Sequence, residues 1–470
     1  MKSEYEDEEN IFEEILLEEI NKKFPDCFDP VKRTLTTHRN NPGVIEAIQK
    51  TVDSTNDPEA VKEVAITLGC FDSEEIFDAA DTLQKVVEID PRKVKGAVKI
   101  LRACRELDKT APTIQSIAWQ AVYYGDDPET VEEWAETLDD VRKLELPEVA
   151  SIEKIITIYQ AEVEPEIIKE LVRTLLTYKR LGRATEVARV LESISWKYNA
   201  CTVGDVARRL RQEHEIIPKT LKKYNGLKVI SATYVLERIA EEAEELPWNL
   251  RKVVEELGQD DVLRTLRKYQ RLKEEGVNAA VEVAKEIIDT AGVYDNLENI
   301  ARALGQEIVL KTLREYQGSK GAEEVVNAII DTAQRTGNPE ITGKVAEILL
   351  EYLESGEADE VAQAIKASSY TSDEPRTVSE VIENVIKTFR AYKGLEAARD
   401  VARAIKEAAD RTDDIRAVTS VTETLLAYKG SEKVGEVARA IEKTALKTRN
   451  VGAIKKVTKY YLNELRTKAQ

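Results

Sequence analysis

Methionine and histidine are almost missing from this chain, which has one Met and two His among 470 residues. Cysteine is nearly as scarce, and its four positions, far apart in the sequence, are Cys27, Cys70, Cys104 and Cys201. None of them has the CxxC or CxxH spacing of a zinc site, and their number is too small for a disulfide framework. A reducing compartment is therefore expected.

Long apolar runs are also lacking. No stretch of about 18 apolar residues occurs, so the sequence contains no candidate membrane-spanning helix. The N-terminal stretch MKSEYEDEENIFEEILLEEI is acidic where a secretory signal is basic and then apolar. These features predict a soluble, cytoplasmic protein with no membrane partner.

Glycine (20 residues) and proline (13 residues) are few, while charged residues make up 33% of the chain. This balance is typical of long helices with ion-paired, solvated faces. Abundant Lys and Glu with few oxidisable residues favours a thermophilic source, although an ordinary mesophilic helical protein fits as well. The length exceeds the roughly 250 to 300 residues of a single core, so several domains or a repeat array are expected.

Charge is unevenly distributed along the chain. Residues 1–150 contain 18 basic and 35 acidic side chains, a net charge of −17, and residues 151–470 contain 51 and 53, a net charge of −2. The last seventy residues alone have a net charge of +6. An acidic third is thus joined to a nearly neutral remainder that ends in a basic segment.

A short pattern, Thr-Leu-x-x-Tyr, recurs from one end of the chain to the other. Close copies are RTLLTY, KTLKKY, RTLRKY, KTLREY, KTFRAY and ETLLAY, and looser copies are RTLTTH, ITLGCF, KILRAC, ETLDDV, EILLEY and VTKYYL. Their second residues stand at positions 34, 67, 100, 137, 174, 220, 265, 312, 348, 388, 424 and 458. Spacings of 33 to 47 residues are typical of helical repeat proteins.

Prolines support this register independently. Five prolines precede a marker by nine residues: Pro58, Pro91, Pro128, Pro165 and Pro339. The preceding residue is Asp57, Asp90, Asp127, Glu164 or Asn338, and an Asp or Asn before Pro is a strong helix start. In DPEAVKEVAITLGCF the apolar positions follow the helical i, i+3, i+4, i+7 spacing, which indicates one buried face.

After each motif comes a short break, often with Gly, and then a second amphipathic run, so one repeat is interpreted as a helical hairpin. No segment alternates with the period of a strand. The sequence predicts an all-α, right-handed superhelical α-solenoid of about twelve helical hairpins sharing one core. Four regions are expected: an acidic leader and capping helix at 1–22, acidic repeats at 23–165, longer central repeats at 166–335, and C-terminal repeats at 336–470.

The pattern resembles the tetratricopeptide and HEAT families of helical repeats. As in tetratricopeptide repeats, Tyr178 follows Pro165 and Tyr352 follows Pro339 by thirteen residues. The chain departs from that family where a small residue is expected ten places after the proline, since it has Leu there. Central spacings of 45 to 47 residues are closer to HEAT or armadillo repeats. The resemblance implies an extended surface that holds other macromolecules, and it implies no particular ligand.

Catalytic or cofactor motifs are not found: GxGxxG, GxxxxGK[ST] and HExxH are absent. His38 occupies the aromatic position of the first repeat, where packing is the expected role, and His214 lies among mixed charges without a Cys or Asp at ligand spacing. The repeated tyrosines are expected to pack in the core. We therefore expect neither an enzyme nor a cofactor.

One feature does suggest binding. Just before and two or three residues after the marker, the helices from residue 173 to 390 are repeatedly basic, with a break at Glu347, whereas the acidic third has Glu136, Asp139 and Asp140 in these positions. Together with the turn after Tyr178, we call these residues the basic ladder: Arg173, Lys179, Arg180, Arg183, Lys219, Lys222, Lys223, Arg264, Arg267, Lys268, Lys311, Arg314, Lys387 and Arg390.

Two interpretations of the basic ladder stay open. Cations near a helix C-terminus stabilise the helix dipole by about 0.3 to 1 kcal/mol each and need no partner. A row of cations can instead bind phosphates or an acidic protein. The amphipathic segment IFEEILLEEI likewise fits either a cap on the stack or a docking helix. The sequence predicts a scaffold that binds a protein partner, with RNA, DNA or a ribonucleoprotein such as the ribosome as the alternative.

Overall fold

The computed structural model describes residues 2–39, 41–72, 75–107, 111–124, 127–159, 165–245, 250–293 and 296–469. Within these ranges the chain forms α-helices and two short 3₁₀ helices and no strand, which confirms the predicted all-α class. The chain divides into two compact units, residues 1–214 and 215–470. Each unit is described by itself.

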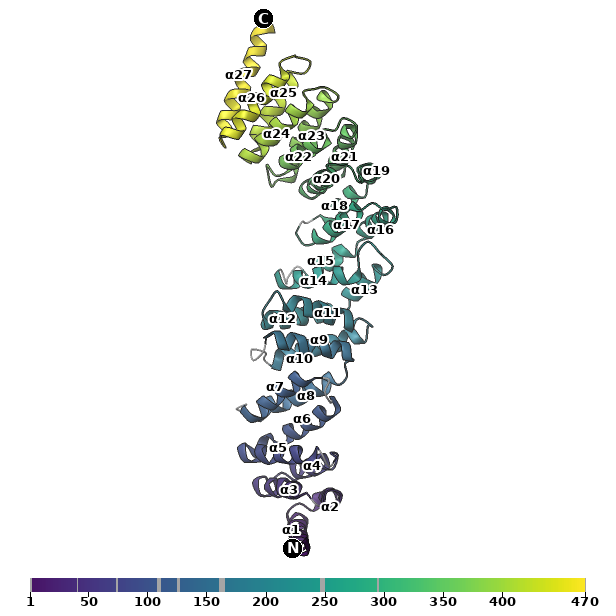
Figure 1. Cartoon of the computed structure of the whole chain (residues 1–470), viewed down its shortest axis with the longest axis vertical. Helices are drawn as coiled ribbons and strands as arrows, with labels where there is room; N and C mark the ends of the chain where they lie inside the picture. Colours follow the sequence, from purple (N-terminus) through teal and green to yellow (C-terminus); the bar gives the residue numbers. More distant parts are fainter. Residues whose placement is uncertain are drawn as a thin grey trace. The chain divides into compact units, whose positions relative to one another are not determined.

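The first unit is a stack of helices in two layers (Figure 1). Helices α2, α4, α6, α8, α10 and α12 pack successively in one layer, and α1, α3, α5, α7, α9 and α11 in the other. The bounds are α1 Lys2–Lys23, η1 Pro25–Cys27, α2 Phe28–Thr37, α3 Pro42–Ser54, α4 Pro58–Leu68, α5 Ile76–Ile89, η2 Pro91–Lys93, α6 Val94–Leu107, α7 Pro112–Tyr124, α8 Pro128–Val141, α9 Leu146–Tyr159, α10 Pro165–Lys179, α11 Ala184–Ser195 and α12 Ala200–Gln212.

The second unit is built in the same way. Helices α14, α17, α20, α22, α24 and α26 form one layer, and the remaining helices form the other. The bounds are α13 Ile217–Lys223, α14 Ala232–Glu245, α15 Leu250–Leu257, α16 Asp260–Glu274, α17 Ala279–Asp289, α18 Leu297–Leu304, α19 Glu307–Glu315, α20 Ala322–Thr336, α21 Pro339–Tyr352, α22 Ala358–Ser369, α23 Pro375–Tyr392, α24 Ala398–Thr412, α25 Ile415–Ala427, α26 Val434–Lys447 and α27 Val451–Ala469.

The predicted helix starts at the five prolines are confirmed. Each of these prolines is the first residue of its helix, and the carboxylates of Asp57 and Asp127 accept hydrogen bonds from free N–H groups of the first turn. Asn338 caps α21 in the same way, and Asp90 caps η2. Glu164 lies outside the described residues. The caps satisfy N–H groups that have no partner within the helix.

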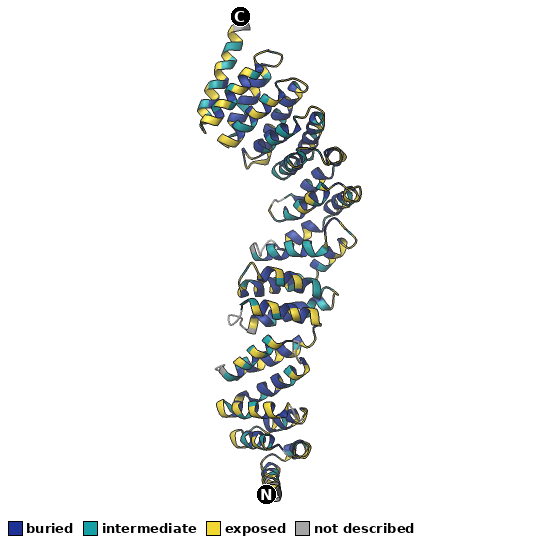
Figure 2. Ribbon diagram, in the orientation of Figure 1, coloured by how far each residue is buried: buried dark blue, intermediate teal, exposed yellow. Residues whose placement is uncertain are grey.

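The repeated tyrosines lie in the core, as predicted. Tyr178, Tyr224, Tyr269, Tyr316, Tyr352, Tyr392 and Tyr428 are each at most 2% exposed, and Figure 2 shows buried residues concentrated between the two layers of each unit. Their hydroxyls also donate hydrogen bonds to a backbone carbonyl oxygen of a neighbouring helix. Burial raises the pKa of Tyr392 to about 12, so this hydroxyl stays a donor at neutral pH.

Six of these seven carbonyl oxygens belong to the last turn of a helix, where no intrahelical N–H is available. Tyr269, for example, donates to the Leu304 carbonyl at 2.8 Å, and Thr265 of the same motif donates to the Ala301 carbonyl at 2.9 Å. The motif therefore packs its own helix against a neighbouring helix and caps the end of that helix.

The three longest repeats differ from the predicted hairpin, because each contains a third helix. These repeats comprise α10 to α12, α13 to α15 and α16 to α18. The tyrosine and its carbonyl acceptor stay 32 to 37 residues apart in all repeats from Tyr178 onward. The additional residues lie between the acceptor and the next tyrosine, for example from Leu257 to Tyr269, where α15 ends and α16 begins. The two-helix expectation is wrong for these repeats.

Candidate functional site

The basic ladder lies on α10, α13, α16, α19 and α23 and on the turn after α10. On these helices the motif's Thr, its Leu or Phe and its Tyr are buried, and the cations between them are exposed or half-buried. The sequence therefore predicted the helices of the ladder and its separation from the core. The sequence did not predict which groups of the protein form hydrogen bonds or ion pairs with the ladder cations.

Eight ladder cations have a hydrogen-bond or ion-pair partner within the protein. Side-chain carboxylates pair with seven of them, at 3.7 Å for Arg173 and Glu170, 3.7 Å for Lys179 and Glu145, 2.6 Å for Arg183 and Glu186, 2.8 Å for Arg264 and Asp261, 3.2 Å for Lys268 and Glu307, 2.6 Å for Arg314 and Glu275, and 3.0 Å for Arg390 and Glu347. The pair with Arg314 holds the pKa of Glu275 below its usual value. Salt bridges between exposed partners contribute little to stability.

Three of the partnered cations are lysines that donate to backbone carbonyls. Lys223 donates to Gly258, Lys268 to Gly305, and Lys179 to Lys143 at 2.7 Å. Gly258 and Gly305 directly follow the last residues of α15 and α18, so Lys223 and Lys268 cap a neighbouring helix rather than their own. These backbone hydrogen bonds support the structural interpretation for the three lysines.

Six ladder cations form no hydrogen bond or ion pair with any described residue: Arg180, Lys219, Lys222, Arg267, Lys311 and Lys387. All six are exposed. Only Lys219 and Lys222 share a helix, α13, and the others occur singly on successive repeats. The structure thus leaves a sparse set of free charges instead of a continuous basic row.

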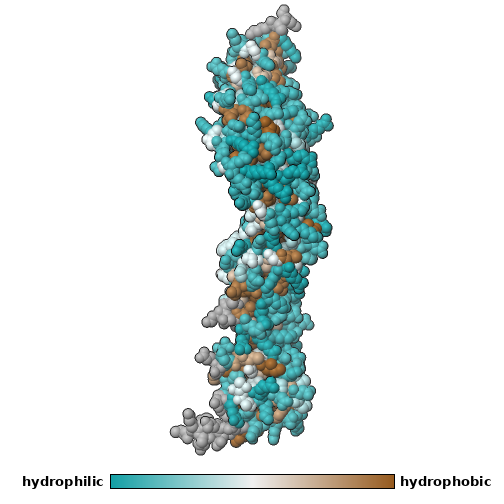
Figure 3. Space-filling model, turned by 90° about the vertical axis from the view of Figure 1, so that its right-hand side faces the viewer, coloured by the Kyte–Doolittle hydropathy of each residue, from teal (hydrophilic) through white to brown (hydrophobic). Residues whose placement is uncertain are grey.

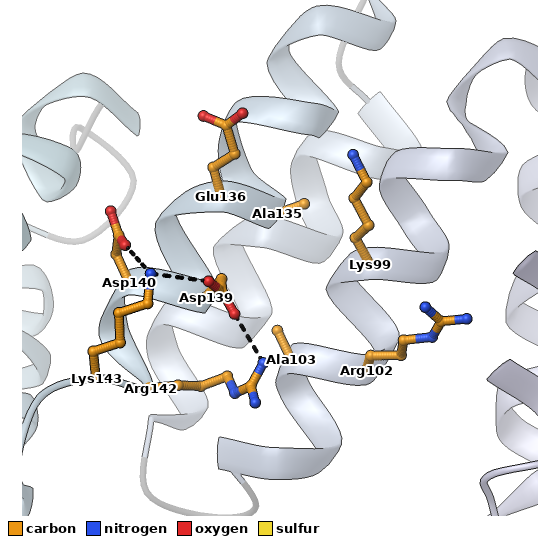
Figure 4. Close-up of a pocket in the computed structure, with 9 residues that line it drawn as sticks. All are labelled: Lys99, Arg102, Ala103, Ala135, Glu136, Asp139, Asp140, Arg142 and Lys143. Carbon is orange, nitrogen blue, oxygen red and sulfur yellow. Dashed lines mark hydrogen bonds and ion pairs between the residues drawn. The ribbon is translucent and has the colours of Figure 1, made fainter.

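A surface groove of about 450 Å³ lies between α6 and α8, where the ladder positions are acidic (Figure 4). Lys143 lies between Asp139 and Asp140, at 3.0 and 2.7 Å, and Arg142 pairs with Asp139 at 2.9 Å. These carboxylates raise the pKa of Lys143. Both aspartates of this groove are therefore paired with cations.

The histidines and cysteines form no chemical site together. His38 is half-buried at the end of α2, and His214 is exposed, with Nδ1 2.9 Å from the Arg211 carbonyl oxygen. Burial raises the pKa of Cys104 to about 12, which disfavours the reactive thiolate. Among the described residues, no group of three or more His, Cys, Asp or Glu side chains could hold a metal ion.

Two further exposed helix faces lie outside the basic ladder, on α1, whose amphipathic segment the sequence identifies as a cap or a docking helix, and on α27. On α1, Ile11, Phe12 and Ile15 are 55%, 65% and 55% exposed. On α27 a face of exposed cations surrounds Tyr460, and the excess of positive charge over the last seventy residues was its only sequence signal. The space-filling view in Figure 3 shows a mainly hydrophilic surface with separate apolar patches.

No family model matches this chain, and a search of curated proteins gives no match either. Within the part of the chain that the structure describes, no helix is both long and apolar enough to cross a membrane.

Proposed function

We propose that this protein is a non-enzymatic cytoplasmic scaffold that binds a protein partner. In this proposal the repeats, about twelve with three of them extended by a third helix, continue as one right-handed superhelical solenoid. X-ray scattering in solution tests the superhelix. A globular chain of this length would have a radius of gyration of about 23 Å, and a measured value close to that would contradict the superhelix.

The observation that supports protein binding most directly is the apolar face of α1. Ile11, Phe12 and Ile15 are exposed on it, and Ile11 and Ile15 are one helical turn apart. Leu16 and Ile20 are buried, at 1% and 0% exposed, and α1 packs against α2 and α3. One face of α1 thus holds the helix on the stack, and another leaves three large apolar side chains uncovered.

Charge defines the partner that this face fits. Residues 1–22 contain nine acidic and two basic side chains, a net charge of −7, and Glu14 and Glu18 are exposed beside the apolar residues. A complementary ligand presents apolar residues flanked by Lys or Arg. We infer an amphipathic basic helix of another protein, since helices bind by inserting an apolar face and charge complementarity selects the partner.

The test is a pull-down from nuclease-treated lysate with a triple variant, Ile11→Ser, Phe12→Ser and Ile15→Ser. We expect a stoichiometric protein partner with the parent chain and its loss with the variant. Phe77→Ser is the matched control, because Phe77 on α5 is also exposed, by 56%. A partner that survives the triple variant, or that disappears on nuclease treatment alone, would contradict the proposal.

The alternative, binding of RNA, DNA or a ribonucleoprotein through the basic ladder, stays a prediction. Its best support is the pair Lys219 and Lys222, which are exposed one turn apart on α13 and have no partner in the part of the chain that the structure describes. A fourfold reversal, K219E, K222E, R267E and K311E, avoids the lysines that cap helices. It should abolish nucleic-acid binding if the basic ladder is the site.

A further inference from the structure

The last helix of the structure, α27, has an outer face with an excess of positive charge. Lys455, Lys456, Lys459 and Arg466 are exposed, and none forms a hydrogen bond or ion pair through its side chain with a described residue. We call these four residues the α27 basic face. The preceding helix and turn add three further exposed cations without such partners: Lys443, Lys447 and Arg449.

The net charge of this segment differs strongly from that of the rest of the chain. Residues 443–470 contain eight basic side chains and one acidic side chain, a net charge of +7, so residues 1–442 have a net charge of −26. The single acid, Glu464, is paired with Lys433 at 3.0 Å. Elsewhere the chain pairs many of its cations, as in the basic ladder, and here it leaves them free.

Helix stability does not account for this face. Cations favour the C-terminal turn of a helix, and their effect on the dipole is confined to the first and last turns. Lys455, Lys456 and Lys459 lie in the second and third turns of α27, which begins at Val451. A polar cap over the stack would also explain exposed charge, but such a cap needs no excess of one sign.

An exposed aromatic side chain lies among these cations. Tyr460 is 65% exposed and follows Lys456 by one helical turn. Its ring packs edge to face on Tyr461, with centroids 5.2 Å apart, and Tyr461 packs in the same way on buried Tyr428 at 6.2 Å. The core therefore holds the Tyr460 ring in place, with most of its surface open to solvent.

Spacing along α27 gives this face a direction. Lys455, Lys459 and Arg466 are related by four and seven residues and lie on one side of the helix, over about 17 Å. Lys456 and Tyr460 form a neighbouring row. Cations that follow a backbone, next to an aromatic platform on which a base can stack, are the elements of single-stranded nucleic-acid recognition.

We propose that the α27 basic face and Tyr460 bind single-stranded nucleic acid, with the cations on the phosphates and a base stacked on Tyr460. A duplex keeps its bases stacked inside and cannot use the tyrosine in this way. This site is separate from the α1 apolar face and from the basic ladder, and it does not depend on the proposed protein partner.

Fluorescence anisotropy with the full chain tests the site, using labelled 20-nucleotide oligo(U) and oligo(dT) as probes at 50 and 200 mM salt. We expect the logarithm of the binding constant to fall linearly with the logarithm of the salt concentration. The slope should be about −3 to −5, as for four to seven phosphate contacts. The variant K455E/K456E/K459E/R466E should abolish binding, and Tyr460→Ala should weaken it roughly five- to hundredfold. A variant with Lys→Gln at the three lysines should lose less affinity than the charge-reversal variant. Because it removes charge without introducing acidic residues, it also controls for misfolding of the reversal variant.

The ladder variant K219E/K222E/R267E/K311E is the matched control with the same change of charge. It should leave oligonucleotide binding within about twofold, because the remaining contacts are unchanged. Loss of binding in this control with binding retained in the α27 variant would overturn the proposal. The proposal would also be wrong if the chain bound vesicles with anionic lipid but no oligonucleotide, or if it bound no oligonucleotide and instead self-associated in a way that the α27 variant abolishes. Equal affinity for a duplex, unchanged by Tyr460→Ala, would contradict it as well.

Discussion

The two units fill the same position of the repeat with different residues. In residues 1–214 the tyrosine position holds His38, Phe71, Cys104 and Val141 before the first tyrosine, Tyr178. In residues 215–470 the first six repeats all have tyrosine there. Helices pack in two layers in both units, so the hydroxyl is not required for the fold.

The first unit caps helix ends with other side chains. Lys23 donates to the Val52 carbonyl of α3 at 2.7 Å, and Thr34 donates to the Ala65 carbonyl of α4 at 2.7 Å. In the second unit the tyrosines make the equivalent bond inside the core, away from water. Carbonyl groups at helix ends in both units thus need a hydrogen-bond donor. Burial decides how much each donor contributes to the stability of the fold.

The largest expected effect is steric and belongs to the second unit. A Cβ at Gly305 would lie 2.4 Å from Thr265 Oγ1, a distance that requires the motif to shift. We expect Gly305→Ala to lower the free energy of unfolding by about 1–3 kcal/mol, measured by urea denaturation. Adding Thr265→Ala should recover part of that loss, since it removes the colliding hydroxyl.

The first unit offers the opposite outcome as a control. A Cβ at Gly204 in α12 would lie no closer than 3.4 Å to Ile167, an ordinary contact. Gly204→Ala should therefore be neutral or stabilise by about 0.5–1 kcal/mol through helix propensity. If Gly305→Ala and Gly204→Ala were equally destabilising, contact with the motif's threonine would not be the reason that position 305 needs glycine.

A smaller effect compares two tyrosines of the second unit. Tyr269→Phe leaves the Leu304 carbonyl at the end of α18 without a donor, and we expect a loss of about 1–2 kcal/mol. Tyr428 donates to the Tyr461 carbonyl at 2.9 Å, which lies inside α27 and has an N–H of its own helix. Tyr428→Phe should cost less than half as much in the same urea experiment. Equal losses would refute the capping role.

The smallest effect is a difference in acid sensitivity between the units. In the first unit all resolved carboxyl shifts are downward. The pKa of Asp57 is lowered by Lys95, that of Asp90 by Arg92, and that of Asp127 by the Thr130 N–H. Stability from a lowered pKa is present above the unfolded value of about 4 and is lost as pH falls through the folded pKa.

The second unit has shifts in both directions. The pKa values of Asp261, Glu275, Glu340 and Asp414 are lowered by cationic partners. Burial raises the pKa of five others: Glu286, Asp289, Glu357, Asp410 and Glu442. A raised pKa disfavours the folded state at neutral pH, and this cost disappears as pH falls. Hydrogen exchange should therefore show a greater loss of protection in residues 1–214 on going from pH 7 to below pH 4. A greater loss in residues 215–470 would contradict this assignment.

Local chemistry made the helices predictable. Asp or Asn before Pro defines a helix start whatever the neighbours are, and the apolar spacing identifies which face becomes buried. For this reason the starts at Pro58 and Pro339 and the burial of Tyr178 could be derived from one sequence. The same reasoning missed the third helix of the long repeats. A Cβ at Gly258, the residue after α15, would lie 3.1 Å from Thr220 Oγ1 of another helix, a close approach that local spacing does not reveal.

The amino-acid sequence by itself determined the helices, their repeat and the total charge, because each follows from neighbours within a few turns. Only the tertiary structure decided which charges are free. Lys223 and Lys222 are adjacent in the same motif, yet Lys223 caps α15 through Gly258 and Lys222 has no partner among the described residues. Their difference is set by a carbonyl 35 residues away, and the spacing of residues along one helix contains no information about it.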